Sequence, residues 1–154
     1  MLFINYLVIA VAALVPTFVG FIWYNPKVFG TIWMKEAGVS PESGKGMNMA
    51  LVMVLCYVLS FMAGISMTMI VIHQNGLISM LQGVPDASNA TSELGQHVKY
   101  LIDNHGANFR SFKHGALHGT LTGFFLALPI VATGAMFEQR SWKYIAISAG
   151  YWII

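Results

Sequence analysis

The stretch that decides the fold is residues 48–73, NMALVMVLCYVLSFMAGISMTMIVIH, which contains no Asp, Glu, Lys or Arg. As an α-helix its 26 residues would extend about 39 Å, which exceeds the roughly 30 Å hydrocarbon core of a bilayer. In lipid, a single segment can satisfy its backbone amides only as a helix. We therefore predict a membrane-spanning helix at about 47–73, with a tilt or a protruding end.

Other uncharged stretches predict further spans at about 2–24 and 113–137, and the start of a last one at 141. Pro16 and Pro129 lie inside the first and third spans, where each removes a helix hydrogen bond, so we expect a kink at each. The remainder of the chain from 141 would extend only about 21 Å as a helix. This indicates either a partial last helix or a chain that continues past Ile154, and we favour the second interpretation.

The composition excludes several classes of protein. Of the 154 residues, 56% are hydrophobic and only 9% are charged, which argues against a soluble globule. The net charge of +2 comes from scattered single residues, so nothing supports binding of nucleic acid. No Lys or Arg precedes Lys27, so the N-terminal stretch has the pattern of a retained span rather than a cleaved signal. We predict one all-α integral membrane domain over 1–154, built as a bundle of four transmembrane helices.

Two connecting segments carry structure of their own. After Asn25 and Pro26, apolar residues at helical spacing predict a short helix at about 26–37 along the membrane surface. The loop at 74–110 contains an amphipathic helix that ends near Gly106 and either packs over one mouth of the bundle or rests on lipid. Three aromatic residues at the first boundary are predicted as interfacial anchors: Trp23, Tyr24 and Trp33.

The distribution of Lys and Arg favours one orientation. The first and third loops hold five of them, whereas the second loop and its flanks hold three: Lys99, Arg110 and Lys113. The positive-inside rule then places the first and third loops in the cytoplasm. The N-terminus and the second loop would lie outside the membrane.

A sequence pattern at the first boundary resembles a known family. Gly20, Trp23-Tyr24, Pro26, Phe29-Gly30 and Trp33 form the pattern G-x-x-W-Y-x-P-x-x-F-G-x-x-W. With four spans and a glycine-rich third helix, the chain resembles domain of unknown function 1761, a group of small multi-pass membrane proteins that are mostly bacterial. The resemblance implies a four-helix membrane fold and a bacterial inner-membrane location. It implies no activity and no functional residue.

Small residues recur every fourth position in two spans. We call these two sets the small-residue ridges, and we predict that they face each other in an antiparallel helix pair. The alternative is a contact with a second copy or another subunit. The third-span ridge comprises Gly115, Gly119, Gly123 and Ala127, and the second-span ridge comprises Cys56, Ser60, Gly64 and Thr68.

Histidines form the one candidate chemical site. His114 and His118 lie one helical turn apart, and antiparallel packing would bring His73 beside them. Three imidazoles can bind zinc or another divalent metal, with Asp103 as a further oxygen ligand, or can relay protons. Against this, histidines just below a membrane surface can be purely structural, and no H-E-x-x-H motif supports a metalloenzyme. We predict no cofactor, with a divalent metal ion as the alternative.

The sequence favours a non-enzymatic subunit or scaffold that packs with other membrane helices, as a homo-oligomer or within a larger complex. The alternative is a transporter of a small solute, protons or a metal ion that uses the histidines. No set of nucleophile, base and orienting residue supports an enzyme.

Overall fold

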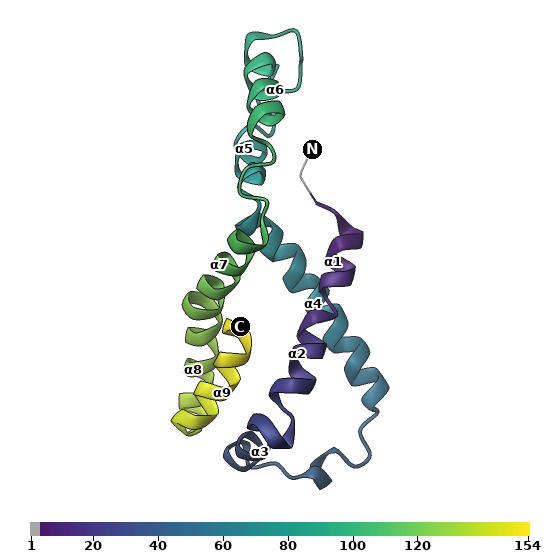
Figure 1. Cartoon of the computed structure of the whole chain (residues 1–154), viewed down its shortest axis with the longest axis vertical. Helices are drawn as coiled ribbons and strands as arrows, with labels where there is room; N and C mark the ends of the chain where they lie inside the picture. Colours follow the sequence, from purple (N-terminus) through teal and green to yellow (C-terminus); the bar gives the residue numbers. More distant parts are fainter. Residues whose placement is uncertain (1–3) are drawn as a thin grey trace.

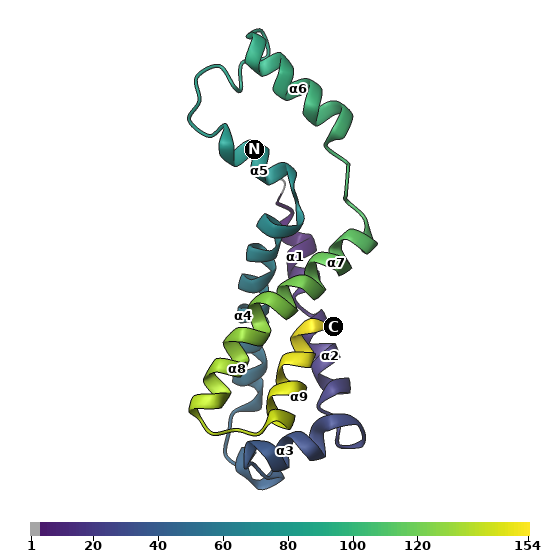
Figure 2. The same ribbon diagram turned by 90° about the vertical axis from the view of Figure 1, so that its left-hand side faces the viewer.

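The computed structural model describes residues 4–154, which are helical and contain no β-strand. The helices form two arms that meet at one end and are joined again near the other by the last helix, with a smaller helical extension beyond the first junction (Figures 1 and 2). The all-α prediction is confirmed.

The first arm begins with a helix that is broken before Pro16. Helix α1 (Tyr6–Ala12) is capped by the Asn5 side chain, which accepts from the Val8 amide, and α2 (Val15–Trp23) follows after a short turn. Because Pro16 has no N–H to donate to the Ala12 carbonyl, the regular bonding pattern is interrupted here. The break lies at the predicted kink.

The first loop contains a wide helical turn followed by a short helix. Residues Pro26–Gly30 form a π-helical turn in which the Gly30 amide donates to the Asn25 carbonyl at 2.9 Å, and α3 (Thr31–Ala37) continues from it. A Cβ on Gly30 would collide with the Tyr24 carbonyl oxygen, so this turn requires glycine. The helical segment lies where the sequence predicts it, but its first turn is π rather than α. A single 3-10 turn, Pro41–Gly44, then leads to the second span.

The second span is one continuous helix, α4 (Met49–Val71), which the Asn48 side chain caps. The short α5 (Gln74–Met80) begins directly after it. Helix α6 (Glu93–His105) carries a Ser92 cap and ends at Gly106, as predicted.

Helices α5 and α6 extend along the long axis of the molecule, away from the spans (Figures 1 and 2). The prediction that the amphipathic helix packs over the mouth of the bundle is therefore wrong. Its connections explain the placement: α5 continues beyond the end of α4, and the return segment reaches α7 only at residues 106–111. Contact of α6 with a lipid surface stays a prediction.

The third span also contains a wide turn. Helix α7 (Phe112–Thr122) passes through a π-helical turn at Gly123–Ala127 into α8 (Leu128–Phe137). Pro129 cannot donate to the Phe125 carbonyl. That carbonyl belongs to the π-helical turn, where the regular α-helical hydrogen bonding is already interrupted. Helix α9 (Trp142–Ile153) then folds back and packs against α8, the wide turn and α3.

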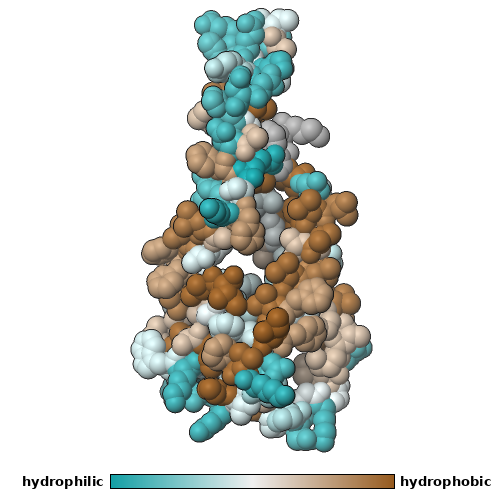
Figure 3. Space-filling view, viewed as in Figure 1, coloured by the Kyte–Doolittle hydropathy of each residue, from teal (hydrophilic) through white to brown (hydrophobic). Residues whose placement is uncertain are grey.

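Within residues 4–154, three helical segments are long and apolar enough to cross a membrane: Tyr6–Trp23, Met49–Val71 and Phe112–Phe137. The large apolar side chains on them are mostly exposed, and the space-filling view shows an extended hydrophobic surface along both arms (Figure 3). Such a surface is stable in contact with acyl chains rather than water. Helix α9 has 12 residues and reaches only about 18 Å. These features support a membrane protein.

The predicted pairing of the two small-residue ridges is wrong. The position of a Cβ on Gly64 would lie 2.8 Å from Ile9 of α1, so this glycine accommodates the first span rather than the third. Gly115 and Gly119 have nothing within 4 Å of such a Cβ, and Gly123 contacts the backbone of α9. Helices α4 and α7 meet near the junction of the arms and then diverge, leaving an opening that is visible in Figure 3.

Candidate metal centre

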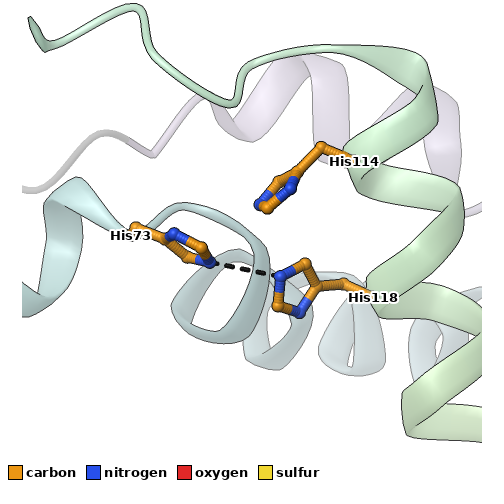
Figure 4. A group of neighbouring side chains, drawn as sticks. All are labelled: His73, His114 and His118. Atoms are coloured by element: carbon orange, nitrogen blue, oxygen red, sulfur yellow. Dashed lines mark hydrogen bonds between the residues drawn. The ribbon is translucent and has the colours of Figure 1, made fainter.

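Three histidines meet where the two arms join. His73 lies at the turn between α4 and α5, and His114 and His118 are on one face of the first turns of α7 (Figure 4). We call them the histidine cluster. The three ring centroids are 4.5 to 5.1 Å apart in pairs. One nitrogen from each residue can be chosen such that all three lie within 4.8 Å of one another.

One of these nitrogens is buried without a partner. His114 Nε2 is shielded from solvent and makes no hydrogen bond within the described part of the chain. The same ring is hydrogen-bonded to the backbone of Val71 at the end of α4. Because Nε2 has no partner, that bond uses Nδ1. A carbonyl held at Nδ1 fixes the tautomer that leaves the other ring nitrogen as an acceptor, which is the arrangement around metal-binding histidines.

The cluster has dimensions that suit a small divalent ion. His73 Nε2 and His118 Nε2 lie 3.1 Å apart. Two nitrogens at about 2.05 Å from a tetrahedral zinc ion are separated by about 3.3 Å. The spacing of this pair is therefore close to one edge of a zinc site, although both rings must rotate for their nitrogens to face one ion, and the His114 ring must move closer. Three imidazoles leave a fourth position for water or another ligand.

A phenyl ring covers one side of the cluster. The Phe109 ring lies 5.6 Å from the His73 ring and 5.2 Å from the His114 ring. Phe109 has a positive φ of 63°, which is rare for a bulky residue. The Gln74 side chain holds this segment by donating to the Asn108 carbonyl at 2.8 Å. The segment between α6 and α7 thus lies against one side of the cluster, while His73 remains exposed.

Other residues that sequence reasoning connected with this site lie elsewhere. Asp103 pairs with Lys99 on α6 at 2.6 Å, so its prediction as a metal ligand is wrong. His105 contacts Asn108, and His97 is exposed on α6. Both histidines lie on the extension, because α6 projects away from the junction.

The predicted interfacial anchors have a role that the sequence did not reveal. Trp23, Tyr24 and Trp33 are only partly exposed and pack against α9. The Trp23 indole donates to the Ile147 carbonyl at 2.9 Å, and the Trp33 indole donates to Ser148 Oγ at 3.2 Å. These rings therefore pack against protein, and their role as interfacial anchors stays a prediction.

The same region explains the pattern that runs from Gly20 to Trp33. Gly20 lies under the Tyr151 ring, and the Tyr151 hydroxyl donates to the Pro16 carbonyl at 2.7 Å. Gly30 permits the wide turn that aligns Trp33 with α9. A model of the family described as protein of unknown function (DUF1761) matches residues 7–154. The chain belongs to the DUF1761 family.

No curated protein matches this DUF1761 chain, and no solved structure does so. The family model covers nearly the whole chain, including the histidine cluster and α9. For this DUF1761 protein, sequence reasoning missed three residues that hold α9: Arg140, Ser148 and Tyr151. Arg140 Nη1 donates to the Ala37 carbonyl at 2.6 Å. Spacing along α9 could have indicated a polar face, because Tyr144, Ser148 and Tyr151 fall on one side of a helix.

Proposed function

We propose that this DUF1761 protein is a non-enzymatic multi-pass membrane protein that binds a divalent transition-metal ion through His73, His114 and His118. The observation that carries this proposal is the convergence of three imidazoles, one of which has a buried, unpartnered ring nitrogen. A ring nitrogen that has no hydrogen-bond partner is costly to bury, and a metal ion would supply the missing interaction. Nitrogen ligands favour zinc and its neighbours among the divalent metals. Metal-ion transport is the activity that such a site would serve best.

Metal analysis of the purified protein tests the proposal. The detergent-solubilised protein, exposed to Zn²⁺ and then desalted, should retain one ion per chain. The double variant His114→Ala, His118→Ala should retain none, because a single imidazole cannot hold the ion. His97→Ala is the matched control, since this histidine lies on α6 outside the cluster, and it should bind zinc as the wild type does.

Two outcomes would contradict the proposal: a wild-type protein without stoichiometric metal, or equal loss of zinc in the double variant and in His97→Ala. Zinc flux into liposomes that contain the protein separates transport from binding alone. Flux that depends on the histidine cluster supports a transporter, whereas tight binding without flux supports a structural or sensory ion.

A second role, as a subunit or scaffold in a larger assembly, has one observation in its favour. Gly115 and Gly119 form an open strip on α7, because a Cβ added to either residue would meet nothing within 4 Å, and another helix can approach closely there. Gly119→Leu should reduce the size of the complex extracted in mild detergent without lowering the stability of the chain itself. Wild-type protein that elutes as a single chain without co-purifying proteins would contradict this role.

The orientation inferred from Lys and Arg places the histidine cluster at the outer face of the cell inner membrane, with the N-terminus and the second loop. Labelling of single cysteines tests it. In a Cys56→Ser background, a cysteine at Ser88 should react with an impermeant maleimide in intact cells, and one at Ser43 should react only after lysis. The reverse pattern would invert the proposed orientation.

A further inference from the structure

A second site lies at the opposite end of the spans from the histidine cluster. A cavity of about 360 Å³ lies between α8 and α9, with Tyr24 and Trp33 of the first arm at its edge. Its position follows from the ends of the spans, because Tyr24 directly follows the first span and Glu138 directly follows the third. The cavity is thus located at a membrane–water boundary.

The lining of this cavity changes from polar to apolar along α8. Glu138 and Tyr144 supply polar groups at the outer end, and the buried Ser148 lies about 9 Å from the start of α9. Ile130 and Val131 line the inner end, and Ile130 precedes Glu138 by eight residues, about 12 Å along a helix. A site that is polar at the boundary and apolar toward the membrane interior has the shape of a phospholipid, with its headgroup outside and its acyl chain inside.

Charges at the polar end identify the headgroup. The Glu138 carboxylate is largely exposed, and Arg140 Nε engages only its Oε2, at 3.3 Å. Arg140 also lies over the Tyr144 ring at 5.6 Å, so that carboxylate, guanidinium and aromatic rings are neighbours. An ammonium group is attracted both by a carboxylate and by aromatic faces. A phosphate on the same molecule would find the guanidinium beside it.

From this arrangement we propose that the α8–α9 cavity binds one zwitterionic aminophospholipid of the phosphatidylethanolamine type. Its primary ammonium lies at Glu138, its phosphate beside Arg140, and an acyl chain along Ile130 and Val131. The ammonium N–H groups donate to the free carboxylate oxygen, which a quaternary ammonium cannot do. The proposal is independent of metal binding, because the two sites are at opposite ends of the spans.

Native mass spectrometry of the full chain in a mild non-ionic detergent tests this site. Dioleoylphosphatidylethanolamine should bind to the wild type with a stoichiometry of one. Its affinity should exceed at least tenfold that of its N-acetylated form, in which a small acetyl group on the nitrogen removes the ammonium charge. Dioleoylphosphatidylglycerol, an anionic lipid with the same chains, and the phosphatidylcholine analogue should both bind more weakly.

Variants test whether the ammonium of the headgroup binds at Glu138. Glu138→Gln should lower the affinity for phosphatidylethanolamine at least tenfold, whereas Glu93→Gln on the distant α6 should leave it unchanged. Equal binding of phosphatidylethanolamine and its N-acetylated form by the wild type would overturn the proposal, as would preferential binding of phosphatidylglycerol. If Glu138→Gln does not fold, comparing phosphatidylethanolamine with its N-acetylated form on the wild type still tests whether the site selects the ammonium group.

Discussion

Two glycines of the third span provide a matched test of how the last helix is held. Gly123 lies against the backbone of α9, where an added Cβ would be 2.6 Å from Ile153 Cα and 2.9 Å from the Trp152 carbonyl carbon. Backbone cannot rotate out of the way as a side chain can, so α9 must move. Gly119 is one turn earlier, and a Cβ there meets nothing within 4 Å. Alanine at each position therefore separates a steric effect from a helix-propensity effect.

Both substitutions gain about 0.5–1 kcal/mol because alanine loses less backbone entropy in a helix than glycine. Gly123→Ala also incurs an overpacking penalty of about 1–3 kcal/mol. The propensity gain cancels in the comparison, so Gly123→Ala should be about 1–3 kcal/mol less stable than Gly119→Ala. Unfolding in mixed micelles with an increasing fraction of denaturing detergent, followed by tryptophan fluorescence, measures the difference. Equal stabilities of the two variants would refute the close contact between α9 and the third span.

Three further outcomes are expected. Zinc affinity of the histidine cluster should fall roughly tenfold or more between about pH 7.5 and 5.5, because protons compete with the metal for neutral imidazole. Competition with a chromophoric chelator measures the affinity, and an affinity independent of pH would indicate other ligands. Trp33→Phe keeps an aromatic ring but loses the donor to Ser148, so the free energy of unfolding in micelles should fall by about 0.5–1.5 kcal/mol. An unchanged free energy of unfolding would mean that this bond does not stabilise α9. Gln74→Leu removes the hydrogen bond to the Asn108 carbonyl, so amide hydrogen exchange at 107–111 should become faster while that of α4 stays constant. Unchanged exchange at 107–111 would show that Gln74 does not hold the segment that packs against the histidine cluster.

The helices were predictable where a local pattern decides them. The uncharged stretch around Cys56 predicts a span at 47–73, and α4 occupies Met49–Val71. The meeting of His73 with His118 was also predictable, because consecutive antiparallel spans bring the end of one beside the start of the next. These inferences need only helix geometry and the order of the elements.

The choice of partner for each helix face could not be predicted from spacing. Gly64 and Gly119 have the same pattern of small neighbours, yet Gly64 packs against Ile9 and Gly119 packs against nothing in the described chain. Trp33 is predicted to lie at a membrane boundary, where a ring is equally stable against lipid or protein, and only the position of α9 decides between them. Periodicity shows that a face is suited to contact, and it contains no information on which element makes that contact.

The wide turn at Gly123–Ala127 has a consequence for how this chain can vary. Each residue of an α-helix turns the chain by about 100°. A π-helical turn holds one extra residue, so deleting one residue from it would restore regular winding and leave the face that bears His114 in about the same relation to the face of α8 that meets α9. Deleting one residue from the regular α-helix on either side would instead rotate these two faces by about 100° relative to each other. The turn is therefore the place where the span can lose one residue while both ends keep their facing, so such a deletion should be easier to accommodate there than in the flanking helix.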